Sequence, residues 1–279
     1  MLLCLGSAVA FGAMGVLGKV AYENGATVGT LLTVRFVLAA AVFWAICGGL
    51  RGVSRRDALA AVALGAAAYA AQAGGFFAAL ERMDAAMVSL LVYTFPAMVA
   101  VAAIVSGRER ADARRLTALA LASAGLVLVV AGAGALDPLG VALSLGAAVV
   151  YSAYIFAGEG LSRRVDAKRL SALVCTGAAA TLTAGSAALG DLRPGELTAA
   201  GWGSLAGIAL ISTVAAIGLF LAGVRRVGPT TASILSTAEP VVTALLAFAA
   251  FGEVLTAPQL LGGTLVLAAV LVLAAPARR

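Results

Sequence analysis

The chain has 279 residues, of which 62% are hydrophobic and only 11% are charged, and its mean hydropathy is +1.06. An ordinary soluble domain is about a quarter charged, so the composition excludes a water-soluble globule. The formal net charge of +6 comes from short connections between apolar runs, so we expect no nucleic-acid partner. Ten spans of about 20 residues would leave room within this length only for short connections.

Apolar runs broken by charged residues, glycine and proline predict the membrane-spanning helices. We place ten of them in chain order, at residues 2–21, 27–50, 58–79, 85–106, 115–134, 138–159, 169–190, 197–221, 228–250 and 256–275. The predicted fold class is therefore an all-α polytopic membrane protein with ten transmembrane helices. No basic residue precedes the first apolar segment and nine spans follow it, so we do not expect a cleaved signal peptide.

Two residue counts argue against several kinds of chemistry. The sequence has no histidine, which removes imidazole-activated nucleophiles, His-ligated metal ions and His proton relays. Its three cysteines lie far apart, so they form neither a disulfide framework nor a metal-binding pair. We therefore expect no catalytic residue, no cofactor and no metal site, and we do not expect an enzyme.

Lysine and arginine concentrate on one side of the predicted spans. Fifteen of the 19 lie in the even-to-odd connections or at the C-terminus, three lie on the opposite side, and Arg35 lies inside the second span. Cytoplasmic connections carry the excess of basic residues in membrane proteins, so both termini are predicted to be cytoplasmic. We expect a multi-pass protein of the plasma membrane, the inner membrane in a bacterium, which acts as a monomer or a homodimer.

The two halves of the chain, 1–134 and 138–279, resemble each other. A shift of 144 residues places Arg82 on Arg226, Pro96 on Pro240 and Glu109 on Glu253. Each half has five spans, an odd number, so the halves have opposite orientations in the membrane. Inverted-topology repeats are typical of transporters, whose substrate site lies between the repeats near the bilayer midplane.

With these motifs the sequence resembles the drug/metabolite transporter superfamily, specifically its EamA-type ten-helix members. The resemblance is carried by Arg82 and Arg226 and by four segments: Thr33-Val34-Arg35-Phe36, Glu239-Pro240, Phe251-Gly252-Glu253 and Gln259-Leu260-Leu261-Gly262-Gly263. It implies a basket of ten helices around a central cavity, with the fifth and tenth helices peripheral. Relatives are reported to export amino acids or metabolites, the aromatic amino acid exporters among them.

Aromatic and polar side chains inside the spans are candidates for lining that cavity. They share helix faces in three groups: Tyr69, Gln72 and Phe76 on the third span, Ser89, Tyr93 and Pro96 on the fourth, and Tyr151 and Tyr154 on the sixth. Aromatic walls with a few hydroxyls and amides suit a mostly apolar solute. The alternative is that these residues serve helix packing or, for the tyrosines, the headgroup belt.

Charged residues and prolines inside the spans also have two interpretations each. Arg35 and Lys19 either contact a substrate carboxylate, or serve structure by pairing with carbonyl groups or reaching the membrane surface. Pro96 and Pro240 each remove a backbone hydrogen bond, and this marks either a gating bend or a static kink. Glu239, the sole mid-span carboxyl, is either a coupling group for protons or a neutral donor to a carbonyl freed by Pro240.

The sequence thus predicts a secondary transporter of small neutral or zwitterionic solutes that works by alternating access. Because the candidate wall is aromatic and carries little charge, aromatic and apolar amino acids are the first expected substrates, and export is the expected direction. A multidrug or cation exporter is the alternative. A channel or an intramembrane enzyme fits less well, because no filter-like glycine run, acidic ring or paired intramembrane aspartates are visible.

Overall fold

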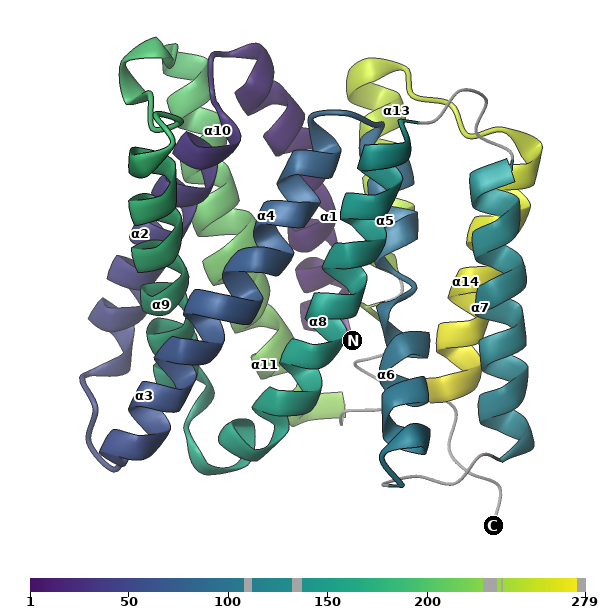
Figure 1. Cartoon of the computed structure of the whole chain (residues 1–279), viewed down its shortest axis with the longest axis horizontal. Coiled ribbons are helices and arrows are strands. Elements are labelled where there is room, and N and C mark those ends of the chain that lie inside the picture. The colour runs from purple at the N-terminus through teal and green to yellow at the C-terminus, as the bar shows by residue number, and fades with distance from the viewer. Residues whose placement is uncertain (108–111, 132–136, 228–234, 237, 275–279) are drawn as a thin grey trace.

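The computed structural model describes residues 1–107, 112–131, 137–227, 235–236 and 238–274. Every regular element in these ranges is a helix (Figure 1). The first half comprises α1 (Leu2–Glu23), α2 (Val28–Cys47), α3 (Arg55–Leu64), the π-helical segment η1 (Gly65–Tyr69), α4 (Ala70–Leu80), α5 (Ala85–Val92), α6 (Phe95–Val105) and α7 (Ala113–Ala131).

The second half begins with the longest helix of the described part, α8 (Pro138–Arg164). It continues with α9 (Ala167–Ala188), the 3-10 turn η2 (Pro194–Glu196), α10 (Ala199–Ala209), the π-helical segment η3 (Leu210–Ala215), α11 (Ala216–Val227), α13 (Ala238–Phe251) and α14 (Ala257–Ala274).

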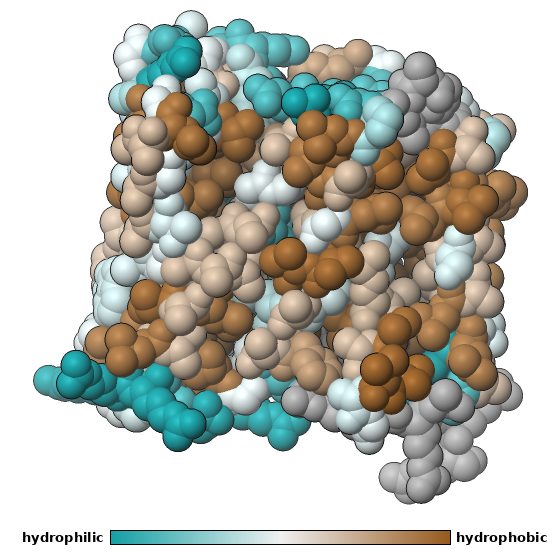
Figure 2. All heavy atoms as spheres, viewed as in Figure 1, coloured by the Kyte–Doolittle hydropathy of each residue, from teal (hydrophilic) through white to brown (hydrophobic). Residues whose placement is uncertain are grey.

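In the described part of the chain, eight helices are long and apolar enough to cross a membrane, and they coincide with the first eight predicted spans. Two shorter apolar helices, Ala238–Phe251 and Ala257–Leu273, follow them. Most of the first ten residues of the predicted ninth span, 228–234 and 237, lie outside the described residues. Figure 2 shows one face of the molecule with a mainly apolar band between hydrophilic ends, as a membrane-spanning bundle requires.

Local chemistry sets the helix ends more sharply than hydropathy does. The second span stops at Cys47, three residues before the predicted end, because Gly48 adopts a left-handed conformation with φ of 66°. The third span starts at Arg55, three residues before the predicted start, because the Ser54 hydroxyl accepts a hydrogen bond from the Asp57 amide. Hydropathy alone misplaced both boundaries, because Gly48-Gly49-Leu50 reads as a continued apolar run and the charged Arg55-Arg56-Asp57 falls outside one.

The helices pack in a pattern that sets α7 and α14 apart. These two pack mainly on each other at one side of the molecule, α2 packs on α9, α1 on α13 and α4 on α8 (Figure 1). Close approach of α7 and α14 depends on glycine, because a Cβ on Gly125 would lie 2.6 Å from the carbonyl oxygen of Gly262. The expectation of a peripheral fifth and last helix is confirmed.

The connections between the helices lie at two opposite ends of the bundle. We call the end with the connections after α1, α4 and α9 the Asp191 end, and the end with the connections after α2 and α8 the Arg163 end (Figure 1). The third and eighth spans both change from α- to π-helix near their middles, at η1 and η3. Such π segments are rare and occur often at functional sites.

Candidate functional site

A continuous row of six aromatic rings runs between the spans, and we call it the tyrosine row. Its neighbouring ring centroids lie 4.7 to 5.9 Å apart, which is the range for favourable aromatic pairs. In order along the row, the members are Phe36 of α2, Tyr69 of η1, Tyr154 and Tyr151 of α8, Phe95 of α6 and Tyr93 just before it. The row therefore joins four predicted candidates from three separate spans.

The other predicted wall residues are not among the paired rings of the row. Phe76 of α4 packs against Phe77, with their ring centroids 5.1 Å apart. Gln72 is half-buried on α4, and Ser89 is buried on α5. Sequence reasoning missed Phe95 as a member of the row, although it directly precedes Pro96, and placed Phe36 only in a family motif.

Arg35 lies near the Phe36 end of the row and is 4% exposed. Its Nε donates a hydrogen bond of 3.1 Å to the Thr213 hydroxyl, and its guanidinium lies over the rings of Phe36 and Phe77. Within the described part of the chain no carboxylate pairs with it. Of its expected structural roles, a carbonyl partner and a surface position, neither is observed, because a hydroxyl and two ring faces hold the charge instead.

Thr213 connects Arg35 to the π segment of the eighth span. The Thr213 hydroxyl donates 2.9 Å to the carbonyl of Ile208, five residues earlier. A π segment disturbs the regular helical hydrogen bonds, so this hydroxyl satisfies a displaced carbonyl while its oxygen accepts from Arg35. The sequence marks Thr213 only as a hydroxyl residue inside an apolar run.

Pro240 leaves the carbonyl of Ser236 without its helical donor. The Tyr93 hydroxyl supplies that donor at 2.6 Å, so the tyrosine row is joined directly to the start of α13. The Tyr93 hydroxyl thus already supplies one donor to this carbonyl, and a bond from a protonated Glu239 to it stays a prediction. The half-buried Glu239 carboxyl lies within electrostatic range of the phenol groups of Tyr69, Tyr93 and Tyr151.

Pro96 marks the break between α5 and α6, where two hydroxyl groups satisfy carbonyls. Thr94 donates 2.7 Å to the Leu91 carbonyl, and the Ser152 hydroxyl of α8 shares its proton between the carbonyl of Ala148, at 2.7 Å, and that of Phe95, at 3.1 Å. These bonds fix the bend of the fourth span against α8. The observed break is thus a hydrogen-bonded kink at the position where the row passes from α8 to α6.

Lys19 belongs to an ion-paired cluster at the Asp191 end, away from the row. Its Nζ lies 2.7 Å from Glu253 Oε1 and 3.4 Å from Asp84 Oδ1. Glu253 also accepts hydrogen bonds of 3.2 and 3.3 Å from the amides of Ala85 and Ala86, which begin α5. Glu253 therefore joins α1, α5 and the connection before α14, and we call this group the Glu253 clasp. A pocket of about 320 Å³ lies beside it.

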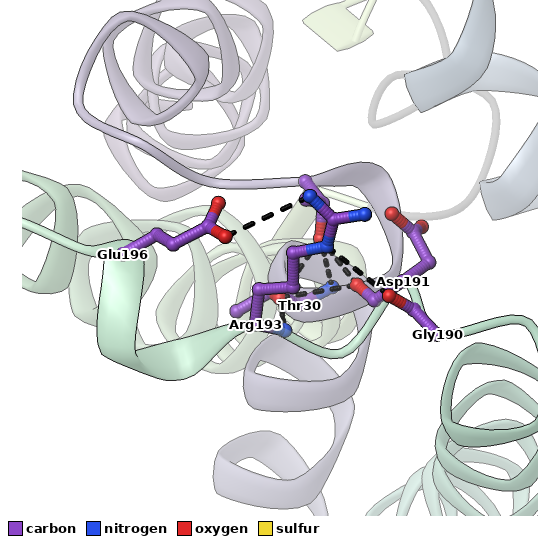
Figure 3. Close-up of polar contacts among 6 residues, drawn as sticks. Thr30, Gly190, Asp191, Arg193 and Glu196 are labelled. Atoms are coloured by element: carbon purple, nitrogen blue, oxygen red, sulfur yellow. Dashed lines mark hydrogen bonds and ion pairs between the residues drawn. The ribbon is translucent and has the colours of Figure 1, made fainter.

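A second cluster at the same end ties the start of α2 to the connection after α9 (Figure 3). The Asp191 carboxylate accepts 2.7 Å from the Gly29 amide, and the Arg193 amide donates 2.8 Å to the Thr30 hydroxyl. Arg193 also pairs with Glu196 at 3.6 Å. The cluster satisfies the first amides of α2, which a helix start leaves without partners.

Arg82, one of the motif residues, forms a third pair at this end. Its Nη1 lies 3.0 Å from Asp137 Oδ2, and Asp137 also accepts from the amides of Leu139 and Gly140 at the start of α8. Hydrogen bonds from the Gly140 amide and the Arg82 side chain, in that order, lower the pKa of Asp137. The pair thus links the third span to the sixth.

Comparison with known proteins decides the family. Residues 1–131 and 138–275 both match the EamA-like transporter family. The chain belongs to that family. It is therefore a multi-pass membrane transporter of the drug/metabolite transporter superfamily, whose substrate is a small molecule, and not an enzyme.

Two relatives and one solved structure are similar to this EamA-like transporter over most of its length. An uncharacterized transporter of Archaeoglobus fulgidus is 28% identical over 71% of this chain and 70% of its own length. The uncharacterized transporter YcbK of Bacillus subtilis is 27% identical over 91% of this chain and 86% of its own. A crystal structure with 18% identity matches with a TM-score of 0.69 over 98% of this chain and 95% of that one, which supports the fold alone.

Proposed function

We propose that this EamA-like transporter exports small zwitterionic or neutral solutes, aromatic and apolar amino acids first, across the bacterial inner membrane. The observation that carries the proposal is the tyrosine row, with Arg35 near one end and Glu239 within electrostatic range of three of its tyrosines. Aromatic faces bind apolar side chains, and mid-span charges serve the polar groups of a solute. In this proposal Gln72, Phe76 and Ser89 contact the solute on its way to or from the row, whereas Lys19 serves the closure of the outer end.

Alternating access follows from two inverted five-helix repeats, 1–134 and 138–279, which together give ten spans. Three observations support the repeat. The family model matches twice, the π segments η1 and η3 fall on the third helix of each half, and Pro96 and Pro240 lie in the fourth. The packing has the same symmetry. The first helix of the first half, α1, contacts the fourth span of the second half, α13, and the first helix of the second half, α8, contacts the fourth span of the first half, α5 and α6. Both termini then lie in the cytoplasm, with the Asp191 end outside.

In this mechanism the Glu253 clasp closes the outer end while the solute enters from the cytoplasm. The clasp holds α1 of the first half to the connection before α14 of the second. Opening toward the outside requires the halves to rock apart, which breaks a bond between Lys19 and Glu253. Pro96 and Pro240 lie where the two fourth helices bend, so they provide flexing points for that motion.

A multidrug or cation exporter is the second candidate, and one observation favours it. The Glu239 carboxyl lies within electrostatic range of three tyrosines, and a carboxyl near aromatic rings suits an organic cation. Such a carrier would need no partner for a substrate carboxylate, so Arg35 would serve structure alone.

Uptake into proteoliposomes that contain the purified protein tests the proposal. The panel comprises aromatic, branched and acidic amino acids and cationic drugs, each with and without a proton gradient. We expect saturable flux of the aromatic and branched amino acids and none of the acidic ones, compared with protein-free vesicles. Flux of cationic drugs alone would favour the second candidate. Flux that does not saturate would indicate a channel and contradict the carrier mechanism.

A further inference from the structure

Glu239 differs from the other carboxyl groups of the described chain in its surroundings. Asp57, Asp84, Asp112, Asp137, Glu159, Glu196 and Glu253 each pair with a lysine or an arginine, Asp166 and Asp191 accept backbone amides, and Glu23 and Glu81 are exposed at helix ends. Glu239, by contrast, lies inside an apolar span and receives no hydrogen bond or ion pair from the described residues. An ionised carboxyl in an apolar interior is costly unless a cation or donors compensate it.

The groups that surround Glu239 do not supply that compensation. Tyr69, Tyr93 and Tyr151 are its electrostatic neighbours, and Tyr93 uses its hydroxyl proton on the Ser236 carbonyl. On the α1 side, Thr243 donates to the backbone carbonyls of Gly12 and Glu239, so it does not serve the carboxyl. The mid-span cation, Arg35, is held by Thr213 and two phenyl rings.

We infer that Glu239 binds the ammonium group of the transported solute, with the tyrosine row as the wall beside it. An ammonium group supplies both the positive charge and the hydrogen-bond donors that the carboxyl lacks, and it is attracted to the faces of neighbouring tyrosine rings. The solute class is therefore an organic primary amine with an apolar or aromatic body. The inference rests on the proposed function, and it identifies Glu239 as the residue that selects amine-bearing solutes.

Three probes that share one aromatic body separate the possible roles of Glu239. Phenylalanine carries an ammonium and a carboxylate, phenethylamine lacks the carboxylate, and 3-phenylpropionate lacks the ammonium. Binding of each is measured on purified protein by competition and by counterflow in proteoliposomes. The wild type is compared with Glu239→Gln, which keeps the shape of the side chain, and with Glu239→Asp, which keeps its charge.

We expect Glu239→Gln to weaken binding of phenylalanine and phenethylamine by roughly ten- to a hundredfold, which is the loss typical of one charge-assisted contact. Binding of 3-phenylpropionate should change less than threefold. Glu239→Asp should recover part of the amine affinity. Glu159→Gln is the matched control, because Glu159 is half exposed and pairs with Arg163 at the end of α8. It should leave all three probes unchanged.

The other outcomes would overturn the inference, the proposed function or both, and each of these cases gives a different result. Equal loss for all three probes in Glu239→Gln, or no loss for any, would overturn the ammonium role. Unchanged amine binding with loss only of accumulation driven by a proton gradient would identify a proton-coupling site instead. Wild-type binding of phenethylamine but not phenylalanine, still dependent on Glu239, would keep the inference and refute amino acid export. Failure of the wild type to bind any probe would refute both.

Discussion

The charged side chains at the Asp191 end and those inside the spans are partnered in opposite ways. At the Asp191 end, Lys19 is held by two carboxylates and Glu253 by one ammonium and two amides. Inside the spans, Arg35 has a hydroxyl and two ring faces, and Glu239 has, among the described residues, phenol groups within electrostatic range but no hydrogen-bond donor or cation as a partner. Both regions contain both charge signs, so the difference lies in partners rather than in composition.

This difference in partners separates the charges that hold the helices together from the charges that are available to bind a solute. A charge that the fold satisfies completely has no capacity left for a solute, and its loss damages the fold. A charge that the fold leaves partly unsatisfied costs free energy until something binds it. Substitutions at the Asp191 end should therefore change stability and gating, whereas substitutions along the tyrosine row should change substrate affinity.

The largest expected effect concerns which side of the membrane each end faces. In a variant without the three native cysteines, all of which are buried, Ser162→Cys at the Arg163 end should be shielded from an impermeant thiol reagent in intact cells. Gly195→Cys at the Asp191 end, where a Cβ meets open space, should be labelled. The reverse pattern would mean that the clasp faces the cytoplasm, and the proposed export cycle would be inverted.

Next in size is the loss of the Glu253 clasp. Glu253→Ala leaves Lys19 with only Asp84 and removes the acceptor for two amides of α5. We expect a destabilisation of about 3 kcal/mol, the lower end for removing one partner of a buried pair, seen as a lower unfolding temperature in detergent. The control is Glu159→Ala, because Arg163 and Glu159 are 77% and 50% exposed, and it should cost less than about 0.5 kcal/mol.

The clasp variant also tests the division between the two regions. Substrates of the wild type should keep their order of affinity in Glu253→Ala, because the clasp does not touch the tyrosine row. A change in that order, with stability unaffected, would show that Lys19 or Glu253 contacts the solute. The division into structural charges and binding charges would then not hold for the Glu253 clasp.

Smaller effects are expected along the row itself. Tyr93→Ala and Tyr154→Ala should each raise the apparent KM several-fold, since an aromatic contact contributes roughly 0.5–1.5 kcal/mol beyond the burial of area. Tyr93→Phe separates packing from hydrogen bonding, because it keeps the ring and loses the bond to Ser236. Unchanged transport kinetics in both alanine variants and in Gln72→Ala would remove this row from the substrate path.

Hydropathy was enough to predict the first eight spans, because an apolar run defines a span from local sequence alone. Periodicity singled out the four tyrosines as candidates, but the faces that they were expected to share with Gln72, Phe76 and Ser89 stay a prediction. The pairing of Tyr93 with Ser236 and of Lys19 with Glu253 could not be predicted, because each joins helices far apart in sequence. The π segments were missed for a different reason, since Gly65–Tyr69 reads as ordinary apolar helix.

The smallest effect is expected from Asp137, because its partner Arg82 is 42% exposed and the pair is open to solvent. Its pKa is lower in the folded protein than in the unfolded chain, owing to the Gly140 amide and Arg82. A carboxyl with a lowered pKa contributes stability above its unfolded value, about 3.9, and that contribution disappears as the pH falls through the folded value. Asp137→Asn keeps an acceptor for the α8 amides but removes the titration. The variant should therefore unfold at a slightly lower temperature than the wild type near pH 6, and the difference should shrink toward pH 3. Because Asp137 is exposed, added salt should reduce the difference at pH 6. A difference that persists unchanged at pH 3 would show that shape rather than charge holds the third span to the sixth.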